Sequence, residues 1–247
     1  MRILVVLFFL ITPVCLFSQG DDWFDNIENI TDNVEEPMLY YERFNAFTGG
    51  DSVRLCNKKP CNGIQKDFWE NGVIKHKAYY QNGRITNGYE NYFENEQLER
   101  KFSIINSSSA ELTVYYKDGT LRSKVEYRRK NPIKWIDYYP NGNVEFIEEY
   151  DNSMEYYIKY NFYFMNGSPQ SILELVDKNE RIYTSKTYYK NGQLKEEGLR
   201  QLNASLGDYV RIGDWKFYDE EGKLTSSHNY YKGEEVEDDS SDDEESD

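Results

Sequence analysis

The sequence predicts an all-β fold: an elongated, single-layer antiparallel β-meander built from repeated hairpins. Glycines recur about every 24 residues after a pair of aromatic residues, with two residues between pair and glycine, or three in the last unit. A fixed period of this size is typical of one supersecondary unit stacked many times. The recurring glycines are Gly72, Gly119, Gly142, Gly167, Gly192 and Gly222, with Glu96 in place of glycine in one unit.

The residues around each glycine predict a strand, a tight turn and a second strand. Asn-Gly and Asp-Gly pairs, including Asn82-Gly83, favour turns because these residues accept positive φ at little cost. After the turn, alternate positions are apolar, as in Ile74, His76, Ala78 and Tyr80. This period of two is typical of a strand with one buried face and one wet face. The unit around Glu96 lacks its turn glycine, so we expect the sheet to be loosest there.

The aromatic pairs predict rings on both faces of the sheet, because adjacent strand residues point to opposite sides. Repetition along the sheet predicts two ladders of stacked rings. The chain has 23 Tyr and 13 Phe but is only 38% hydrophobic. Since tyrosine tolerates water at its hydroxyl, this composition favours a thin sheet over a thick core.

The first 18 residues resemble a signal peptide. Arg2 precedes an apolar stretch over residues 3–17, and Ser18 offers a small residue at the expected cleavage point. Cys15 permits a lipoprotein interpretation, but the larger Val14 before it disfavours one. Nothing later in the chain is apolar enough to predict a transmembrane segment. We therefore expect an exported protein that is periplasmic, at the cell surface or secreted.

Charge and composition divide the remaining chain into three parts. Residues 19–38 form an acidic linker, residues 39–233 the repeat array, and residues 234–247 an acidic tail that we expect to be disordered. The tail carries ten of the acids behind the net charge of -15. Nucleic acid is excluded as a partner, because phosphate binding requires a basic face.

Cys56 and Cys61 remain after signal cleavage, and their short spacing predicts a disulfide in an oxidising compartment. A metal site would need two further ligands at zinc-site spacing, and none is present. His76 and His228 fit structural positions of the repeat. The sequence holds no hydrolase, zinc-protease or phosphate-binding motif. These observations predict a protein that is not an enzyme and has no cofactor.

The recurring aromatic-aromatic-x-Asn-Gly-x-Leu pattern resembles the MORN-repeat variant found in bacterial YwqK-like proteins. A second matching stretch runs from Gly213 through Tyr218 into Gly222, Lys223 and Leu224. The resemblance covers roughly residues 39–233. It implies a single-layer hairpin array, and members of the family are often described as antitoxins or as protein- or lipid-binding modules.

Together these features predict an exported, non-enzymatic scaffold or protein-binding module. Its partner would be an unknown protein, with a co-encoded toxin as one candidate, or a surface polymer. An antitoxin role and a membrane-surface lipid-binding role remain alternatives. Because Tyr and Trp anchor interfaces, five aromatic residues are the candidate binding surface: Trp69, Trp135, Trp215, Tyr139 and Tyr189.

Overall fold

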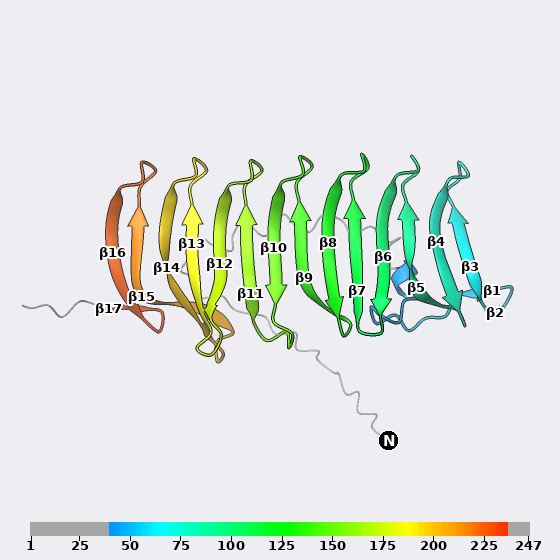
Figure 1. Ribbon diagram of the computed structural model, residues 1–247, viewed down its shortest axis with the longest axis horizontal. Helices are drawn as coiled ribbons and strands as arrows, with labels where there is room; N and C mark the ends of the chain where they lie inside the picture. Colours follow the sequence, from blue (N-terminus) through cyan, green and yellow to red (C-terminus); the bar gives the residue numbers. More distant parts are fainter. Residues whose placement is uncertain (1–39, 237–247) are drawn as a thin grey trace, which may run out of the picture. The chain divides into compact units, whose positions relative to one another are not determined.

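A computed structural model describes residues 40–236, which consist almost entirely of β-strands and the turns between them (Figure 1). The predicted signal peptide with Cys15, the linker and most of the acidic tail lie outside the described residues. The strands are β1 (Leu55–Cys56), β2 (Lys59–Pro60), β3 (Gly63–Phe68), β4 (Ile74–Gln81), β5 (Arg84–Tyr92), β6 (Leu98–Asn106), β7 (Ser109–Tyr115), β8 (Leu121–Arg128), β9 (Asn131–Tyr138), β10 (Val144–Tyr150), β11 (Tyr157–Tyr163), β12 (Pro169–Asp177), β13 (Ile182–Tyr188), β14 (Leu194–Asn203), β15 (Asp208–Tyr218), β16 (Leu224–Tyr231) and β17 (Glu234–Val236).

Strands β3 to β17 form one 15-stranded sheet in which every strand pairs with its neighbours in the sequence. All pairings are antiparallel, so the sheet is an uninterrupted series of hairpins (Figure 1). Strands β1 and β2 make a separate two-stranded hairpin. The predicted all-β meander is therefore confirmed.

The ends of the repeat array differ from the predicted boundaries. The hairpins of the 15-stranded sheet begin at Gly63 and not at residue 39, because residues 40–62 contribute no strand to that sheet. At the other end, Glu234–Val236 pair with β16 as strand β17, so the first three residues of the predicted tail belong to the sheet. An acidic edge strand of this kind disfavours further strand pairing.

Turns of one type recur along one edge of the sheet. In the turn at Gly142, the Gly142 amide donates to the Tyr139 carbonyl at 2.8 Å. The Tyr139 amide donates to the Asn143 carbonyl at 2.9 Å. The Asn141 side chain accepts a bond from the Asn143 amide and donates one to Met165 of the next turn. The predicted turn glycines all have positive φ, from 77° to 88°: Gly72, Gly83, Gly119, Gly142, Gly167, Gly192 and Gly222.

The turn at Glu96 forms without its glycine, and the expectation that this unit is the loosest stays a prediction. Glu96 adopts a φ of 68°, and its amide bonds to the Phe93 carbonyl at 3.1 Å, as the glycine does elsewhere. Asn95 also repeats the bond to the following turn, at the carbonyl of Lys117. Neighbouring turns therefore impose the conformation on a residue that does not favour it.

Replacing Glu96 with glycine is expected to raise the free energy of unfolding by about 1 kcal/mol, because it removes the cost of a side chain at positive φ. Urea denaturation of the purified protein measures the change. The reverse substitution, Gly72→Ala, is the matched control, since Gly72 holds the same turn position at a φ of 83° with open space around a Cβ atom. Destabilisation by Glu96→Gly would contradict this account.

The aromatic pairs do not form the predicted ladders of stacked rings. The second residue of four pairs instead donates a hydrogen bond to a backbone carbonyl of the next pair along the sheet. Tyr139 bonds to Tyr163 at 2.9 Å, and Tyr189 bonds to Tyr218 at 2.8 Å. Tyr116 and Trp69 make the corresponding bonds to Tyr138 and Tyr92. These side chains tie neighbouring repeats together at the turn edge.

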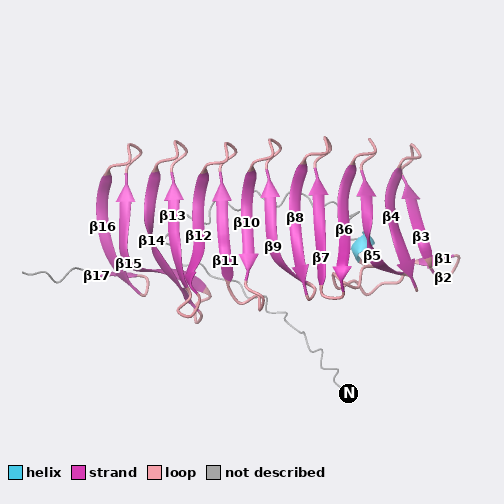
Figure 2. Ribbon diagram, in the orientation of Figure 1, coloured by secondary structure: helices cyan, strands magenta, loops and turns pink. Residues whose placement is uncertain are grey.

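The main core lies where residues 40–54 pack on one face of β4–β8. This segment starts with a helical turn at residues 40–42, coloured cyan in Figure 2. Phe44 and Phe47 then enter a cluster with apolar side chains of the sheet, and the Phe44 carbonyl accepts a bond from the Ile85 amide at 2.8 Å. The buried members of this cluster are Phe44, Phe47, Cys61, Ala78, Tyr80, Ile85, Tyr89, Phe102, Ala110, Leu112, Val114 and Val125.

Candidate functional site

One face of the sheet, here called the charged face, carries cross-strand pairs of lysine and glutamate. Lys134 contacts Glu149 at 2.9 Å, for example, and Lys186 contacts Glu197 at 3.1 Å. Such surface pairs contribute at most about 1 kcal/mol each, but they balance the charge of this face. The pairs are Lys77–Glu90, Lys101–Glu90, Lys124–Glu111, Lys134–Glu149, Lys159–Glu174 and Lys186–Glu197.

The opposite face, here called the aromatic face, carries a row of directly paired residues from β4 to β11. The row runs through Ala78, Tyr89, Phe102, Leu112, Val125, Trp135, Glu148 and Tyr160. Its first five members belong to the core beneath residues 40–54. Trp135 is 39% exposed, so the row emerges from the core at β9.

The aromatic side chains of β10 and β11 form a continuous cluster beside Trp135. The Phe146 ring centroid lies 4.7 Å from that of Phe162, and Tyr160 lies 5.4 Å from Phe146 and 4.6 Å from Tyr157. Tyr157 in turn lies 4.5 Å from Tyr150. These six residues of β9–β11, together with Glu148, form the central surface of the aromatic face: Trp135, Phe146, Tyr150, Tyr157, Tyr160 and Phe162.

Carboxylates carry the charge of the central surface. Burial raises the pKa of Tyr150 to about 12, and the nearby Glu148 carboxylate contributes to that rise. Burial likewise raises the pKa of Tyr157 and Tyr160, again with a contribution from Glu148. The tyrosines therefore stay protonated at neutral pH. Asp137, on the same face, accepts a hydrogen bond from the Trp135 indole at 2.6 Å.

The five candidate aromatic residues of the sequence do not form one surface. Trp135 lies on the central surface, whereas Trp69, Tyr139 and Tyr189 lie half-buried along the turn edge, bonded to backbone. The sequence prediction missed Glu148 and its ring neighbours on β10 and β11. A signal was present: six residues after a turn glycine, where other units carry Ala78 or Val125, this unit carries a glutamate.

The prediction of Trp215 as a binding-surface residue is wrong, because its side chain is completely buried. Its indole rests on Gly198, where a Cβ atom would come within 2.4 Å of the ring. The Arg211 guanidinium lies 4.5 Å from the indole centroid and Arg200 lies 5.2 Å from it. The glycine below the ring and the two arginines beside it thus create a second local core, separate from the main core beneath residues 40–54.

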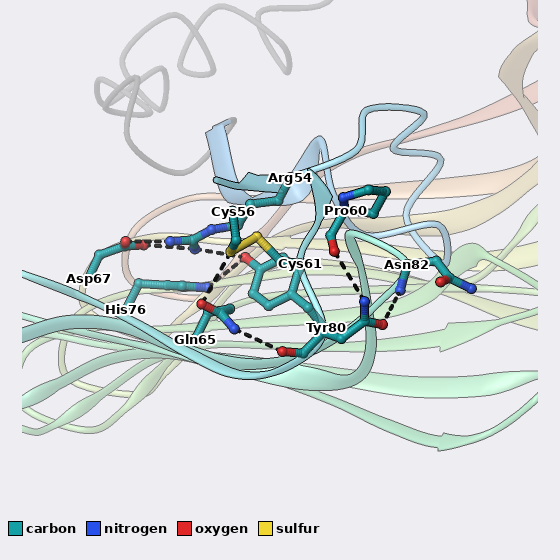
Figure 3. The surroundings of a disulfide bond; sticks show 10 residues. Arg54, Cys56, Pro60, Cys61, Gln65, Asp67, His76, Tyr80 and Asn82 are labelled. Atoms are coloured by element: carbon teal, nitrogen blue, oxygen red, sulfur yellow. Dashed lines mark hydrogen bonds and ion pairs between the residues drawn. A yellow bond between two sulfur atoms is a disulfide. The ribbon is translucent and has the colours of Figure 1, made fainter. Parts of the chain in front are cut away.

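Cys56 and Cys61 form a disulfide beside the first hairpin of the array (Figure 3). Arg54, on the segment before it, bonds to both carboxylate oxygens of Asp67 at 2.5 and 2.9 Å and to the Tyr80 hydroxyl at 3.2 Å (Figure 3). These contacts fasten the segment that covers the core to strands β3 and β4. The disulfide closes only a short loop, so its main effect is to hold this local geometry.

His76 continues this network and is completely buried. Its Nε2 atom lies 3.0 Å from the Tyr80 hydroxyl and its Nδ1 atom 2.7 Å from Asn91, and Tyr41 stacks on the ring at 3.7 Å. Burial lowers the pKa of His76 to about 4, with Arg54 also acting in that direction. His228 lies at the other end of the sheet and is partly exposed. Its Nδ1 atom lies 2.5 Å from the Glu235 carboxylate. Both histidines have structural contacts.

The lowered pKa of His76 predicts that acid destabilises this end of the sheet. An unfolded histidine has a pKa near 6.5, so between about pH 6.5 and 4 the unfolded chain binds the proton that the folded chain excludes. Stability should therefore fall with decreasing pH in this window, with a contribution from His76 of up to about 1.4 kcal/mol per pH unit. Urea denaturation across the window measures the slope. His76→Gln should have a shallower slope than the unaltered protein; equal slopes for the two proteins would contradict the prediction.

Two features are absent from residues 40–236: a cluster of metal-binding side chains and a helix of membrane-spanning length and hydropathy. Among these described residues, no group of three or more His, Cys, Asp or Glu side chains could hold a metal ion. No helix in that part of the chain is long and apolar enough to span a membrane.

Comparison with protein families matches five segments of the chain to the MORN repeat variant: residues 62–82, 110–129, 133–152, 184–201 and 211–232. Each segment contains one hairpin with its turn, from β3–β4 to β15–β16. Hairpins β5–β6 and β11–β12 fall between matched segments but keep the same turn bonds at Glu96 and Gly167. No curated protein matches the chain. The chain therefore contains MORN repeat variant units, which form successive hairpins of one antiparallel sheet.

Proposed function

We propose that this protein is a non-enzymatic protein-binding module, and that its partner docks on the central surface of the aromatic face. The observation that carries this proposal is the contrast between the two faces. The charged face balances its own lysines and glutamates, whereas the central surface presents clustered aromatic rings beyond the segment that covers the core.

The composition of the central surface supports a protein partner. Aromatic residues are enriched in protein interfaces, where a large rigid ring buries much area and loses little conformational entropy. Trp135, at the border of the covered core, has the exposed indole expected of an interface anchor. Tyr157 adds a hydroxyl that accepts a bond from Tyr150 at 3.0 Å and can donate its own proton to a polypeptide backbone.

Selection from a displayed peptide library tests the proposal, because it samples many candidate sequences at once and needs no named partner. The folded protein is expected to enrich a set of related peptides, and the double variant Trp135→Ser/Phe146→Ser should lose them. Lys134→Ser/Ile147→Ser, two neighbouring residues of the same strands on the charged face, is the matched control and should retain binding. Enrichment that survives the first double variant, or that the control abolishes equally, would overturn the placement of the surface.

We further propose that the protein is exported. The Cys56–Cys61 disulfide supports this location, because disulfides persist in oxidising compartments. Trapping of free thiols with a maleimide in intact cells tests it. Modification of both cysteines without a preceding reduction step would contradict an oxidising location.

The antitoxin role is a specific form of the same proposal, in which the partner is a toxin encoded beside the protein. Co-expression with the neighbouring gene product tests it through rescue of growth, and loss of rescue in Trp135→Ser/Phe146→Ser would place the toxin on the central surface. A lipid-binding role has less support, since the charged face is balanced and the central surface carries carboxylates, which repel anionic lipid.

A further inference from the structure

Glu148 occupies an unusual position on the central surface, because aromatic residues surround it on four sides. Trp135 of β9 and Tyr160 of β11 are its direct cross-strand partners. Phe146 and Tyr150 lie two positions before and after it on the same strand and therefore on the same face. A carboxylate among the negative faces of aromatic rings offers two kinds of attraction to one cation.

The described part of the chain supplies this carboxylate with no cation, whereas five glutamates of the charged face each pair with a lysine. Glu149, the next residue along, points to the opposite side and pairs with Lys134 at 2.9 Å. Among the described residues, no lysine or arginine forms an ion pair with Glu148; its contact is with the Tyr150 hydroxyl. Half-buried carboxylates usually have a partner, so an external cation would complete this site.

A similar arrangement on the same face of the sheet is completed by the chain itself. Near its C-terminal end, the Arg211 guanidinium lies 4.5 Å from the Trp215 ring centroid and bonds to the Glu196 carboxylate at 3.0 Å. Trp215 is thereby fully buried, whereas Trp135, with a carboxylate as its cross-strand neighbour, stays 39% exposed. The two sites share an indole and a carboxylate and differ in the cation.

We propose that the position between Trp135, Glu148 and Tyr160 binds the guanidinium of an arginine side chain that the docked polypeptide supplies. The inference rests on the docking surface proposed above and assigns the chemistry of its partner. Arginine fits better than lysine, because a planar guanidinium stacks on an aromatic ring while its edge bonds to both oxygens of a carboxylate. The partner is thus a polypeptide segment with an arginine among apolar residues.

A peptide titration followed by NMR tests this assignment. The probe is the acetylated and amidated peptide Gly-Leu-Arg-Leu-Gly, and its counterpart carries citrulline, a neutral analogue of arginine. Concentrations up to about 20 mM are suitable, since a single side-chain contact is expected to bind in the millimolar range. The indole N–H signal of Trp135 is the reporter, assigned by its loss in Trp135→Phe. The arginine peptide should shift this signal and the citrulline peptide should not.

Glu148→Gln is expected to weaken binding of the arginine peptide about tenfold, because it replaces a charge-assisted bond with a neutral one. Glu149→Gln is the matched control on the opposite face and should leave the affinity unchanged. Equal shifts with arginine and citrulline, no shift with arginine up to the highest concentration, or unchanged affinity in Glu148→Gln would each overturn the inference.

The library selection separates this inference from the proposed function. Selected peptides that need Trp135 and Phe146 but contain no arginine would leave the docking surface in place and overturn the arginine site. Peptides that contain arginine but bind Glu148→Gln as tightly as the unaltered protein would also overturn the site. Loss of all selected peptides in Trp135→Ser/Phe146→Ser, together with weakened binding in Glu148→Gln, would support both.

Discussion

Replacing Trp215 with alanine is expected to lower the free energy of unfolding by about 3–5 kcal/mol, the cost of removing a large buried side chain. The indole is fully buried between Gly198, Arg200 and Arg211, and its Nε1 atom donates to the Leu199 carbonyl at 3.0 Å. Loss of the indole would leave a cavity and remove the cation–π contacts of Arg200 and Arg211. Urea denaturation measures the change.

Hydrogen exchange locates the damage from Trp215→Ala. In a repeat array each unit contacts mainly its neighbours, so amide protection should fall in β14–β16 and persist in β4–β8. Trp135→Ala is the matched control: Trp135 is 39% exposed, and its removal should cost about 1 kcal/mol or less. Similar losses in the two variants would show that the burial of Trp215 does not determine its contribution.

The substitution Gly88→Ala is expected to destabilise the protein by about 3 kcal/mol or more, through backbone strain and a steric clash together. Gly88 lies within β5, opposite Ser103 of β6, with a φ of 121°. A Cβ atom there would lie 2.0 Å from the backbone carbonyl oxygen of Phe102. Because a backbone atom cannot rotate away, β5 and β6 would have to separate beside the buried rings of Tyr89 and Phe102.

Gly142→Ala controls for the loss of glycine alone. Gly142 also has positive φ, at 85°, but open space surrounds the position of its Cβ atom. We expect this variant to lose about 1 kcal/mol, the cost of positive φ without a clash. Urea midpoints of the two variants give the comparison. A smaller loss for Gly88→Ala than for Gly142→Ala would contradict the role assigned to close strand approach.

The repeat pattern predicts the hairpins well because turn formation and strand alternation are local properties. The Asn-Gly pairs fix where the chain reverses, and alternation fixes which residues share a face. Thus Ala78 and Tyr80, predicted on the apolar side, belong to the core. Local pattern alone does not reveal that the turn at Glu96 forms, because bonds to the neighbouring turns also hold it.

The candidate site could be predicted only in part. Trp135 and Trp215 are the same residue type on the same face, and nothing within the local pattern separates the exposed ring from the buried one. The difference comes from Gly198 and Arg211, which lie on the strand before Trp215 and at the start of its own strand. The role of Glu148 likewise depends on the strands beside it, since Trp135 and Tyr160 reach it only through cross-strand register.

The sequence by itself determined the all-β meander, the positions of its turns and the division of each strand into a wet side and an apolar side. These follow from φ preferences and from alternation along the chain, which neighbouring residues set. The tertiary structure decided which part of the apolar side is covered. Residues 40–54 fold onto β4–β8 and leave β9–β11 outside the core cluster, because burial depends on which distant segments come together in space.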